Sequence, residues 1–432
     1  MRKLLIVRVL AAAGMAAAVA GRAQTPDFQR FPNPEFAQMI YEQPWVANLT
    51  TCPYEVVARP GRGTRAPRGY KPFYISHYGR HGARSGWSHG RIELVIDLLS
   101  KAKDAGILSA SGDSLLQETM LVKDATNNME GRLTIRGQRE HRAIASRMYR
   151  NFRGVFRRGS RNIRAYSSTV PRCLVSMAAF TNCLCKQDPK LNIVMDCGEK
   201  IQKEITNDSD PDIRPKWHAI TDSLKNAVNL DYSWMMSHLF TDSTAAKSIV
   251  TDPKRLSYAI YSVGRISCSF DYDFNIFRHI PFEDLYSWAD YNNVYVYLGQ
   301  CNSIPFGDSR MERTKPLVRF IVRNADEAIS EGNVAVDLKF GHDYPLLALC
   351  SYLGVEGIAE RYDAEEARKH IISTLYTPFA GNLQLVFYKS RKAGKPVLVK
   401  VLLNEQEVRL LGLEPVQGPY YSWEEFREKI SC

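Results

Sequence analysis

The chain has 432 residues, of which 45% are hydrophobic and 24% are charged, and its formal net charge is +11. A chain of this length and composition can bury a large core, which excludes a disordered or fibrous protein. The basic excess suits anionic ligands. Because no run of Lys and Arg is interleaved with aromatic residues, we expect no nucleic-acid partner.

The N-terminus has the pattern of a secretory signal peptide. Met1-Arg2-Lys3 carries positive charge, and an alanine-rich apolar stretch follows, with small residues at Ala20 and Ala23. Its uninterrupted run is shorter than the roughly 20 residues that a membrane-spanning helix needs. We therefore expect residues 1–23 to be a signal peptide and the protein to be exported, periplasmic or secreted, without a membrane span.

The cysteines favour neither zinc binding nor a fixed disulfide pattern. Nine are present, so at least one stays unpaired within the chain, although export permits disulfides. Cys173 and Cys350 lie in apolar helical patterns, which predict buried free thiols. Cys183 and Cys185 are too closely spaced for a zinc half-site, and no paired Cys or His set accompanies them. We expect no metal and no cofactor.

In chain order, residues 24–70 are rich in Pro, Gly and Arg and predict an extended lead-in. Strands and helices then alternate. The strand candidates are 73–76, 162–166, 191–195, 334–340, 383–388 and 397–403. Helices are expected over 92–99, from Pro171 onward, and from about Pro345 to Gly354.

This alternation predicts an α/β fold, a three-layer sandwich with a mainly parallel sheet. Residues 71–198 and 321–432 would form the core. Residues 199–320 break the pattern, because they are aromatic-rich and helical in period, and they predict an inserted helical subdomain that walls the site. Ligands of such sheets bind at the carboxyl ends of the strands.

The loop after the first strand is Arg80-His81-Gly82-Ala83-Arg84. Two guanidiniums beside one imidazole are unfavourable unless an anion lies among them, and Arg matches phosphate oxygens in a bidentate manner. An imidazole beside a bound phosphate is placed to attack phosphorus. The alternative is a solvated basic turn, since short motifs arise by accident.

Two further loops add candidate residues. Arg172 falls in the first turn of a helix, where the helix dipole disfavours a cation unless an anion binds there; alternatively it is an exposed arginine. His342 and Asp343 follow the strand over 334–340. Asp343 is either a helix cap or the acid that a phosphomonoesterase needs to protonate its leaving group.

These motifs, in this order, resemble the histidine acid phosphatase family, the branch of the histidine phosphatase superfamily that includes phytases and multiple inositol polyphosphate phosphatases. The matching segments are Arg80-His81-Gly82-Ala83-Arg84, Gly131-Arg132-Leu133-Thr134 with Gly137, Ser167-Ser168-Thr169 with Arg172, and Gly341-His342-Asp343.

The resemblance implies an α/β sheet sandwiched by helices, no metal, and a phosphohistidine at His81. It further implies that Arg80, Arg84, Arg172 and His342 hold the phosphate and that Asp343 protonates the leaving group. Ser85-Gly86 replaces a segment that commonly contains proline in the family. The His342-Asp343-Tyr344 segment resembles acid phosphatases and many phytases, whereas the stretch from Gly131 to His141 is more similar to the inositol polyphosphate branch.

The sequence therefore predicts a phosphoric monoester hydrolase acting on a small phosphorylated molecule, with inositol phosphates first among the substrates. A broad-specificity acid or sugar phosphatase of the same family is one alternative, and a phosphate-binding protein without turnover is another. The oligomeric state and a role for Tyr344 beside Asp343 remain open at this stage.

Overall fold

The computed structural model describes residues 25–61, 63–86, 89–206 and 211–431. The predicted signal peptide, 1–23, lies outside the described residues. Within them, no helix is both long enough and apolar enough to cross a membrane.

One sheet organises the molecule. Its strands are β1 Tyr70–Arg80, β2 Asn162–Ser167, β3 Asn192–Asp196, β4 Val336–Gly341, β5 Asn382–Ser390, β6 Leu398–Leu403, β7 Gln406–Glu407 and β8 Tyr420–Ser422. Their order is β3-β2-β4-β1-β5-β6-β7, and β8 pairs with β6. Strands β3, β2, β4 and β1 are mutually parallel, and β5 runs antiparallel to β1. The predicted mixed α/β fold with a mostly parallel sheet is confirmed.

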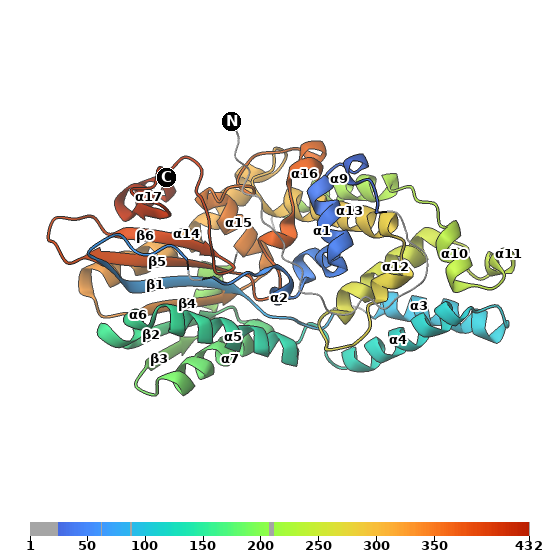
Figure 1. Cartoon of the computed structure of the whole chain (residues 1–432), viewed down its shortest axis with the longest axis horizontal. Helices are drawn as coiled ribbons and strands as arrows, with labels where there is room; N and C mark the ends of the chain where they lie inside the picture. The colour runs from blue at the N-terminus through green and yellow to red at the C-terminus, as the bar shows by residue number, and fades with distance from the viewer. Residues whose placement is uncertain (1–24, 62, 87–88, 207–210, 432) are drawn as a thin grey trace.

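Helices cover both faces of this sheet (Figure 1). One face packs against α5 Ile135–Asn151, α6 Arg153–Arg158 and α7 Pro171–Gln187. The other packs against α8 Glu199–Ile205, α14 Gly307–Glu331, α15 Asp343–Leu353 and α17 Trp423–Ile430. The predicted three-layer arrangement therefore forms around two separate apolar cores, one on each side of the strands.

Strand β4 shows why an alternating sequence can be buried on both faces. Val336, Leu338 and Phe340 point into the core under α5 and α7. Asp337 lies in the opposite direction and is fully buried, which is tolerated because its carboxylate accepts hydrogen bonds from Tyr74 Oη (2.6 Å) and Arg164 Nε (2.7 Å). Paired polar groups thus replace apolar packing on one face.

A helical lobe lies beside the sheet (Figure 1). Its elements come from four parts of the chain, and apolar residues from all four contribute to one core. Before β1 are η1 Phe28–Arg30, α1 Pro34–Glu42, η2 Pro44–Thr51 and α2 Tyr54–Val57; after it are α3 Gly90–Asp104 and α4 Ala110–Thr126. The remaining elements are α9 Arg214–Ala227, α10 Ser233–Leu239, α11 Ser243–Ala246, α12 Pro253–Ser267, η3 Ile276–His279, α13 Phe282–Gln300, α16 Ala364–His370 and η4 Ser373–Leu375.

The prediction of an extended lead-in over 24–70 is wrong for the segment from η1 to α2. Its prolines do not interrupt helices but begin them, since Pro34 and Pro44 lie in the first turns of α1 and η2. Asn33 caps α1 by accepting a hydrogen bond from the Phe36 amide at 3.0 Å. Phe36 and Ile40 are fully buried in the core of the helical lobe, and this burial stabilises so short a helix.

The segment 199–320 is helical, as its periodicity predicts, although the predicted limit at 320 falls inside α14. The lobe also includes α1, α3 and α4, because the apolar faces of these helices need partners that the sheet does not provide. All cysteines among the described residues are free thiols, and Cys173 and Cys350 are buried as predicted.

Candidate active site

The three predicted loops meet at one edge of the sheet. Adjacent parallel strands place Arg80, the last residue of β1, opposite Gly341, the last residue of β4. On the other side of β4, Ser167 at the end of β2 lies opposite Phe340. The loops that follow β1, β2 and β4 therefore converge, as expected for carboxyl ends in such a sheet.

His81 lies at the centre of this edge and is 2% exposed. Its backbone amide donates to Gly341 O at 3.0 Å, which ties the loop to β4. Its Nδ1 lies 2.9 Å from Gly82 O, and because a carbonyl can only accept, Nδ1 carries the proton. Nε2 then keeps its lone pair. Burial, followed by the charges of Arg80 and Arg172, lowers the pKa of His81 well below its usual value, so the ring is neutral.

The segment from Gly131 to His141 packs against the loop that carries His81 and holds its backbone in place. A Cβ added to Gly82 would lie 2.4 Å from Gly137 O, so only glycine permits this approach to α5. The Ala83 amide donates to Glu140 Oε2 at 2.8 Å, and Ala83 O accepts from the Thr134 amide at 2.9 Å. The second motif thus fixes the backbone that carries His81.

Arg80 is completely buried. Its Nη1 donates to Thr377 O at 2.8 Å and to Thr50 O, and its Nη2 lies 3.1 Å from Asp343 Oδ2. The guanidinium carbon lies 4.8 Å from the centre of the Phe379 ring. Burial lowers the pKa of Arg80, because it disfavours the charged form. Keeping this cation in the site therefore costs free energy, and a bound anion would reduce that cost.

Arg84 ends the same loop on the side of the helical lobe. It pairs with Leu133 in an isolated antiparallel bridge, and its Nη1 donates to Ser85 O at 2.8 Å. Burial lowers the pKa of Arg84 to about 9, although the Asp343 charge acts to raise it. The nearby charges of Arg80 and Arg172 lower it further. The guanidiniums of the site are therefore close enough to repel one another.

Arg172 lies in the first turn of α7, as predicted, but it is only 9% exposed and is not a solvated arginine. Its Nη2 lies 3.2 Å from His342 Nδ1. Since a guanidinium can only donate, His342 Nδ1 accepts, and its Nε2–H donates to Ser168 Oγ at 3.1 Å. Burial and then Arg172 lower the pKa of His342 to about 4, so this ring is also neutral.

Asp343 is not the cap of its helix. His342 occupies the N-cap position of α15, and Asp343 is the first helical residue. Its Oδ1 accepts from the Tyr344 amide at 3.1 Å. Burial acts to raise the pKa of Asp343, but Arg80 and Arg84 outweigh it and hold the pKa below its usual value. Without substrate this carboxyl is ionised.

Tyr344 is half-buried beside Asp343. Burial and then the neighbouring Asp343 charge raise its pKa, so the phenol keeps its proton. The site edge therefore combines three guanidiniums and one carboxylate, which is a net positive environment suited to a phosphate dianion. Among the described residues, no group of three His, Cys, Asp or Glu side chains is arranged to hold a metal ion.

All six sequence-predicted residues, Arg80, His81, Arg84, Arg172, His342 and Asp343, are brought together. Sequence reasoning missed the groups that hold them: Thr50 O and Thr377 O on Arg80, Phe379 beneath its guanidinium, and Glu140 under the loop. Glu140 follows Gly137 by three residues on one helix face, which is a usable signal. The other contacts come from segments without a local motif.

The comparisons with known proteins agree with this geometry. The family model described as the histidine phosphatase superfamily (branch 2) matches residues 38–404. A search of curated proteins found no match.

Among solved structures, a multiple inositol polyphosphate phosphatase from Bifidobacterium longum in complex with phosphate has a TM-score of 0.74 at 17% identity, covering 89% of this chain and 97% of that one. The same protein with inositol hexasulfate has a TM-score of 0.71 at 16% identity over equal shares. A phytase from D. castellii has a TM-score of 0.67 at 11% identity, covering 90% of this chain and 85% of that one.

At such identities these structures establish the common fold, while the family model, which spans most of the chain, confirms the resemblance of the ordered motifs. The chain belongs to the histidine phosphatase superfamily (branch 2) and is a phosphoric monoester hydrolase.

Proposed function

We propose that this protein is an exported phosphatase that works through a phosphohistidine at His81. The observation that carries the proposal is the hydrogen bond from His81 Nδ1 to Gly82 O at 2.9 Å. It fixes the tautomer whose Nε2 lone pair is available, and the lowered pKa of His81 keeps that lone pair unprotonated at acid pH. A buried, oriented and neutral imidazole meets the requirements of a nucleophile.

In the first step, Nε2 attacks phosphorus and the bond from phosphorus to the ester oxygen breaks. The electron pair of that bond stays on the leaving oxygen, which takes a proton from Asp343. In the second step, a water oxygen attacks the phosphohistidine, Asp343 takes the water proton, and the P–N bond breaks to return the neutral imidazole. Atoms and charges balance, and inorganic phosphate and an alcohol are the products.

Arg80, Arg84, Arg172 and His342 hold the phosphoryl oxygens in this proposal. Three guanidiniums stabilise the charge that the equatorial oxygens carry in the transition state. His342 donates through the nitrogen that now contacts Ser168 Oγ. The buried contacts of Arg80 with Thr50 O, Thr377 O and Asp343 keep one guanidinium oriented before substrate arrives, which lowers the cost of reorganisation during the reaction.

Asp343 must be protonated to act as the acid, yet the arginines keep it ionised in the free site. A bound phosphate compensates the charges of Arg80 and Arg84, which removes the main cause of the lowered pKa. The substrate monoanion also brings a proton, since the second pKa of a phosphate monoester is about 6. The acid is therefore formed in the complex and not before it.

For the substrate we propose inositol phosphates, with other phosphate monoesters such as sugar phosphates next. The support is the likeness in fold to a multiple inositol polyphosphate phosphatase and a phytase, together with the net positive charge of the site. Export rests on the N-terminal sequence pattern alone. Fractionation of cells that make the chain with and without residues 2–23 tests it, since only the full chain should leave the cytoplasm.

The test of the mechanism is a trapping experiment. Brief incubation with phosphate-labelled substrate, followed by quenching under conditions that preserve phosphohistidine, should leave one acid-labile phosphoryl group on the native protein. The His81→Ala variant should carry no label. Label that persists in that variant would exclude His81 as the nucleophile, and the absence of hydrolysis of any phosphate ester by the native protein would favour the non-catalytic alternative.

A further inference from the structure

Helix α8 is linked to two of the loops that surround the reaction centre. In the loop between β2 and α7, the Thr169 amide donates to Gln202 Oε1 on α8 at 2.9 Å. At the C-terminal end of the same helix, Ile205 O accepts a hydrogen bond from Tyr78 Oη at 3.0 Å. Because Tyr78 also contacts the loop between β4 and α15, the single helix α8 connects both loops.

Tyr78 joins β1, α8 and the start of α15 through one hydroxyl group. It lies two residues before Arg80 on β1 and is 1% exposed. Its phenol oxygen accepts a hydrogen bond from the His342 amide at 3.3 Å and donates its proton to Ile205 O. A side chain at Gly341 would overlap this oxygen, so only glycine permits the approach. Burial raises the pKa of Tyr78, and the hydroxyl therefore keeps the proton that it donates.

Helix α8 is itself held in place by tertiary contacts. Ile201 and Ile205 are buried in the core that α8 shares with α14 and α15. Glu204 forms an ion pair with Arg323 of α14, with Oε1 and Nη2 3.2 Å apart. A helix of seven residues is not stable alone, so these contacts determine its position. The loops that α8 contacts are thus held against the main core of the molecule.

These loops carry Arg172 and His342, whose side chains lie against each other. Arg172 Nη2 is 3.2 Å from His342 Nδ1. Neither residue belongs to the loop that carries His81, so their distance from its ring depends on how the loops after β2 and β4 are held. Gly341 O accepts from the His81 amide at 3.0 Å, and the Tyr78 hydroxyl holds the amide that follows. Donors that stabilise a transition state must be in place before it forms, so these supports matter for catalysis.

We infer that Tyr78 and Gln202 are positioning residues for phosphoryl transfer. Through α8 they set the separation of the loops after β2 and β4, and with it the placement of Arg172 and His342 around the phosphate. They act through these two residues and not by contact with the reacting atoms. This inference rests on the proposed function and deepens it, because it gives the first helix of the segment 199–320 a part in catalysis.

The first experiment compares two buried tyrosines of β1. Tyr78→Phe removes the hydroxyl and keeps the ring, and kcat with p-nitrophenyl phosphate should fall about ten-fold while KM changes by less than about three-fold, because the His342 amide loses its partner. Tyr74→Phe is the matched control, since the Tyr74 hydroxyl donates to Asp337 and not to a loop of the site. It should lower the stability to urea without lowering kcat. Equal falls of kcat in both variants would overturn the inference.

The role of Gln202 has its own readout. Gln202→Leu removes the acceptor of the Thr169 amide and should lower kcat a few-fold, whereas Gln202→Glu keeps an oxygen acceptor and should restore it. Lys203→Ala is the control, because Lys203 is exposed on the same helix. Equal effects of the Leu and Glu variants, or no effect of the Leu variant, contradict this role.

A double-mutant cycle separates positioning from a general effect on the fold. If Tyr78 acts through His342, adding Tyr78→Phe to His342→Ala should lower kcat by less than about two-fold, since residues that act as a unit are not additive. A further ten-fold loss in the double variant would show that the two residues act independently and would overturn the inference.

Hydrogen exchange separates this inference from the proposed function. The His342 amide is bonded to Tyr78 Oη in the native protein, so it should exchange at least about ten-fold faster in Tyr78→Phe. The amides of α5 should exchange at the native rate in the same variant. Unchanged exchange at His342 overturns the inference even if the protein is an active phosphatase, whereas faster exchange supports the positioning of this loop by Tyr78 even if no phosphate ester is hydrolysed.

Discussion

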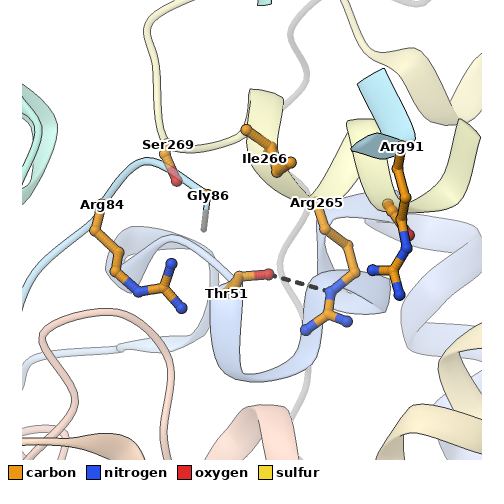
Figure 2. A pocket seen from close by; sticks show the side chains of 8 residues that line it. Thr51, Arg84, Gly86, Arg91, Arg265, Ile266 and Ser269 are labelled. Carbon is orange, nitrogen blue, oxygen red and sulfur yellow. Dashed lines mark hydrogen bonds between the residues drawn. The ribbon is translucent and has the colours of Figure 1, made fainter. Parts of the chain in front are cut away.

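The edge of the sheet and the part of the helical lobe that carries Arg265 and Arg91, which we call the wall (Figure 2), both present arginines, but they hold them in different ways. Arg80 at the sheet edge is completely buried, bound by backbone carbonyls and paired with Asp343. Arg265 on the wall is half-buried and is held by two neutral side chains, while Arg91 is exposed. A buried guanidinium costs free energy and is rigid, whereas an exposed one costs little and can adapt.

This difference predicts how substitutions in the two regions should differ in their effects. The sheet edge needs fixed geometry, because transition-state stabilisation depends on donors that are already in place. The wall has no such requirement for fixed geometry, since Arg265 is half-buried and Arg91 is exposed. Substitutions at the edge should therefore lower kcat, and substitutions on the wall should leave kcat nearly unchanged. The following predictions test that division, in order of decreasing effect.

His81→Ala should have the largest effect. Loss of the nucleophile should lower kcat by roughly a million-fold, the scale seen when a nucleophile is removed from other enzymes. Inorganic phosphate should still bind, because the arginines remain. Steady-state kinetics and calorimetry measure the two effects, and residual turnover above about one per cent would contradict the mechanism.

Asp343→Asn should have the second largest effect, and it should depend on the leaving group. Alkyl phosphates should react about a thousand-fold more slowly, whereas p-nitrophenyl phosphate, whose leaving group needs no proton, should lose far less. Asn keeps the acceptor for the Tyr344 amide, so the start of α15 should survive.

The same variant should also change the pH profile. In the native enzyme, activity on alkyl phosphates should fall as pH rises above about 6, where substrate and acid have lost the shared proton. Tyr344→Phe is the matched control and should retain that profile if the phenol takes no part. An equal, small effect of Asp343→Asn on both ester classes would remove Asp343 from the mechanism and direct attention to Tyr344.

Arg172→Lys should lower kcat roughly a hundred-fold, since the ammonium keeps the charge but not the planar two-point contact. Arg80→Lys and Arg84→Lys should have effects of the same kind. Arg158→Lys is the control, because Arg158 is exposed on α6. An unchanged kcat would place Arg172 with the wall and not with the sheet edge.

Glu140→Gln should have the smallest effect on catalysis at acid pH. Burial raises the pKa of Glu140 to about 7, even though the backbone amides of Ala83 and Tyr54 favour its charged form. At pH 5 the native carboxyl is therefore already neutral, as the glutamine side chain is. We expect kcat at pH 5 to change by less than about five-fold, the range of a single neutral hydrogen bond. A larger loss would assign Glu140 a direct part in the reaction.

The stability of the same variant should depend on pH. A folded pKa of about 7 lies above the unfolded value near 4.5, so the protonated carboxyl stabilises the fold below pH 4.5, and this contribution is lost as pH rises through 7. Urea unfolding should show the native protein losing about 3 kcal/mol relative to Glu140→Gln between pH 5 and 8. Glu425→Gln is the matched control, because Glu425 is exposed on α17.

Much of the edge of the sheet was predictable because its signals are local. Functional residues lie at or within a few residues of the strand ends, as Arg80 and His81 do at the end of β1 and as His342 and Asp343 do after β4. Parallel pairing then requires that these strand ends meet. The region before β1 was not predictable in this way, since Pro34 and Pro44 resemble loop residues until the core that buries Phe36 and Ile40 is known.

The sequence by itself determined the family, the α/β class and the six residues at the sheet edge, because motif order and strand–loop–helix spacing are properties of the chain. Only the tertiary structure decided that His342 and not Asp343 caps α15, that Gly82 O fixes the tautomer of His81, and that Thr51 orients Arg265. Thr51 and Arg265 are 214 residues apart. No local pattern encodes a contact at that separation, since it exists only once the N-terminal segment and α12 pack into one core.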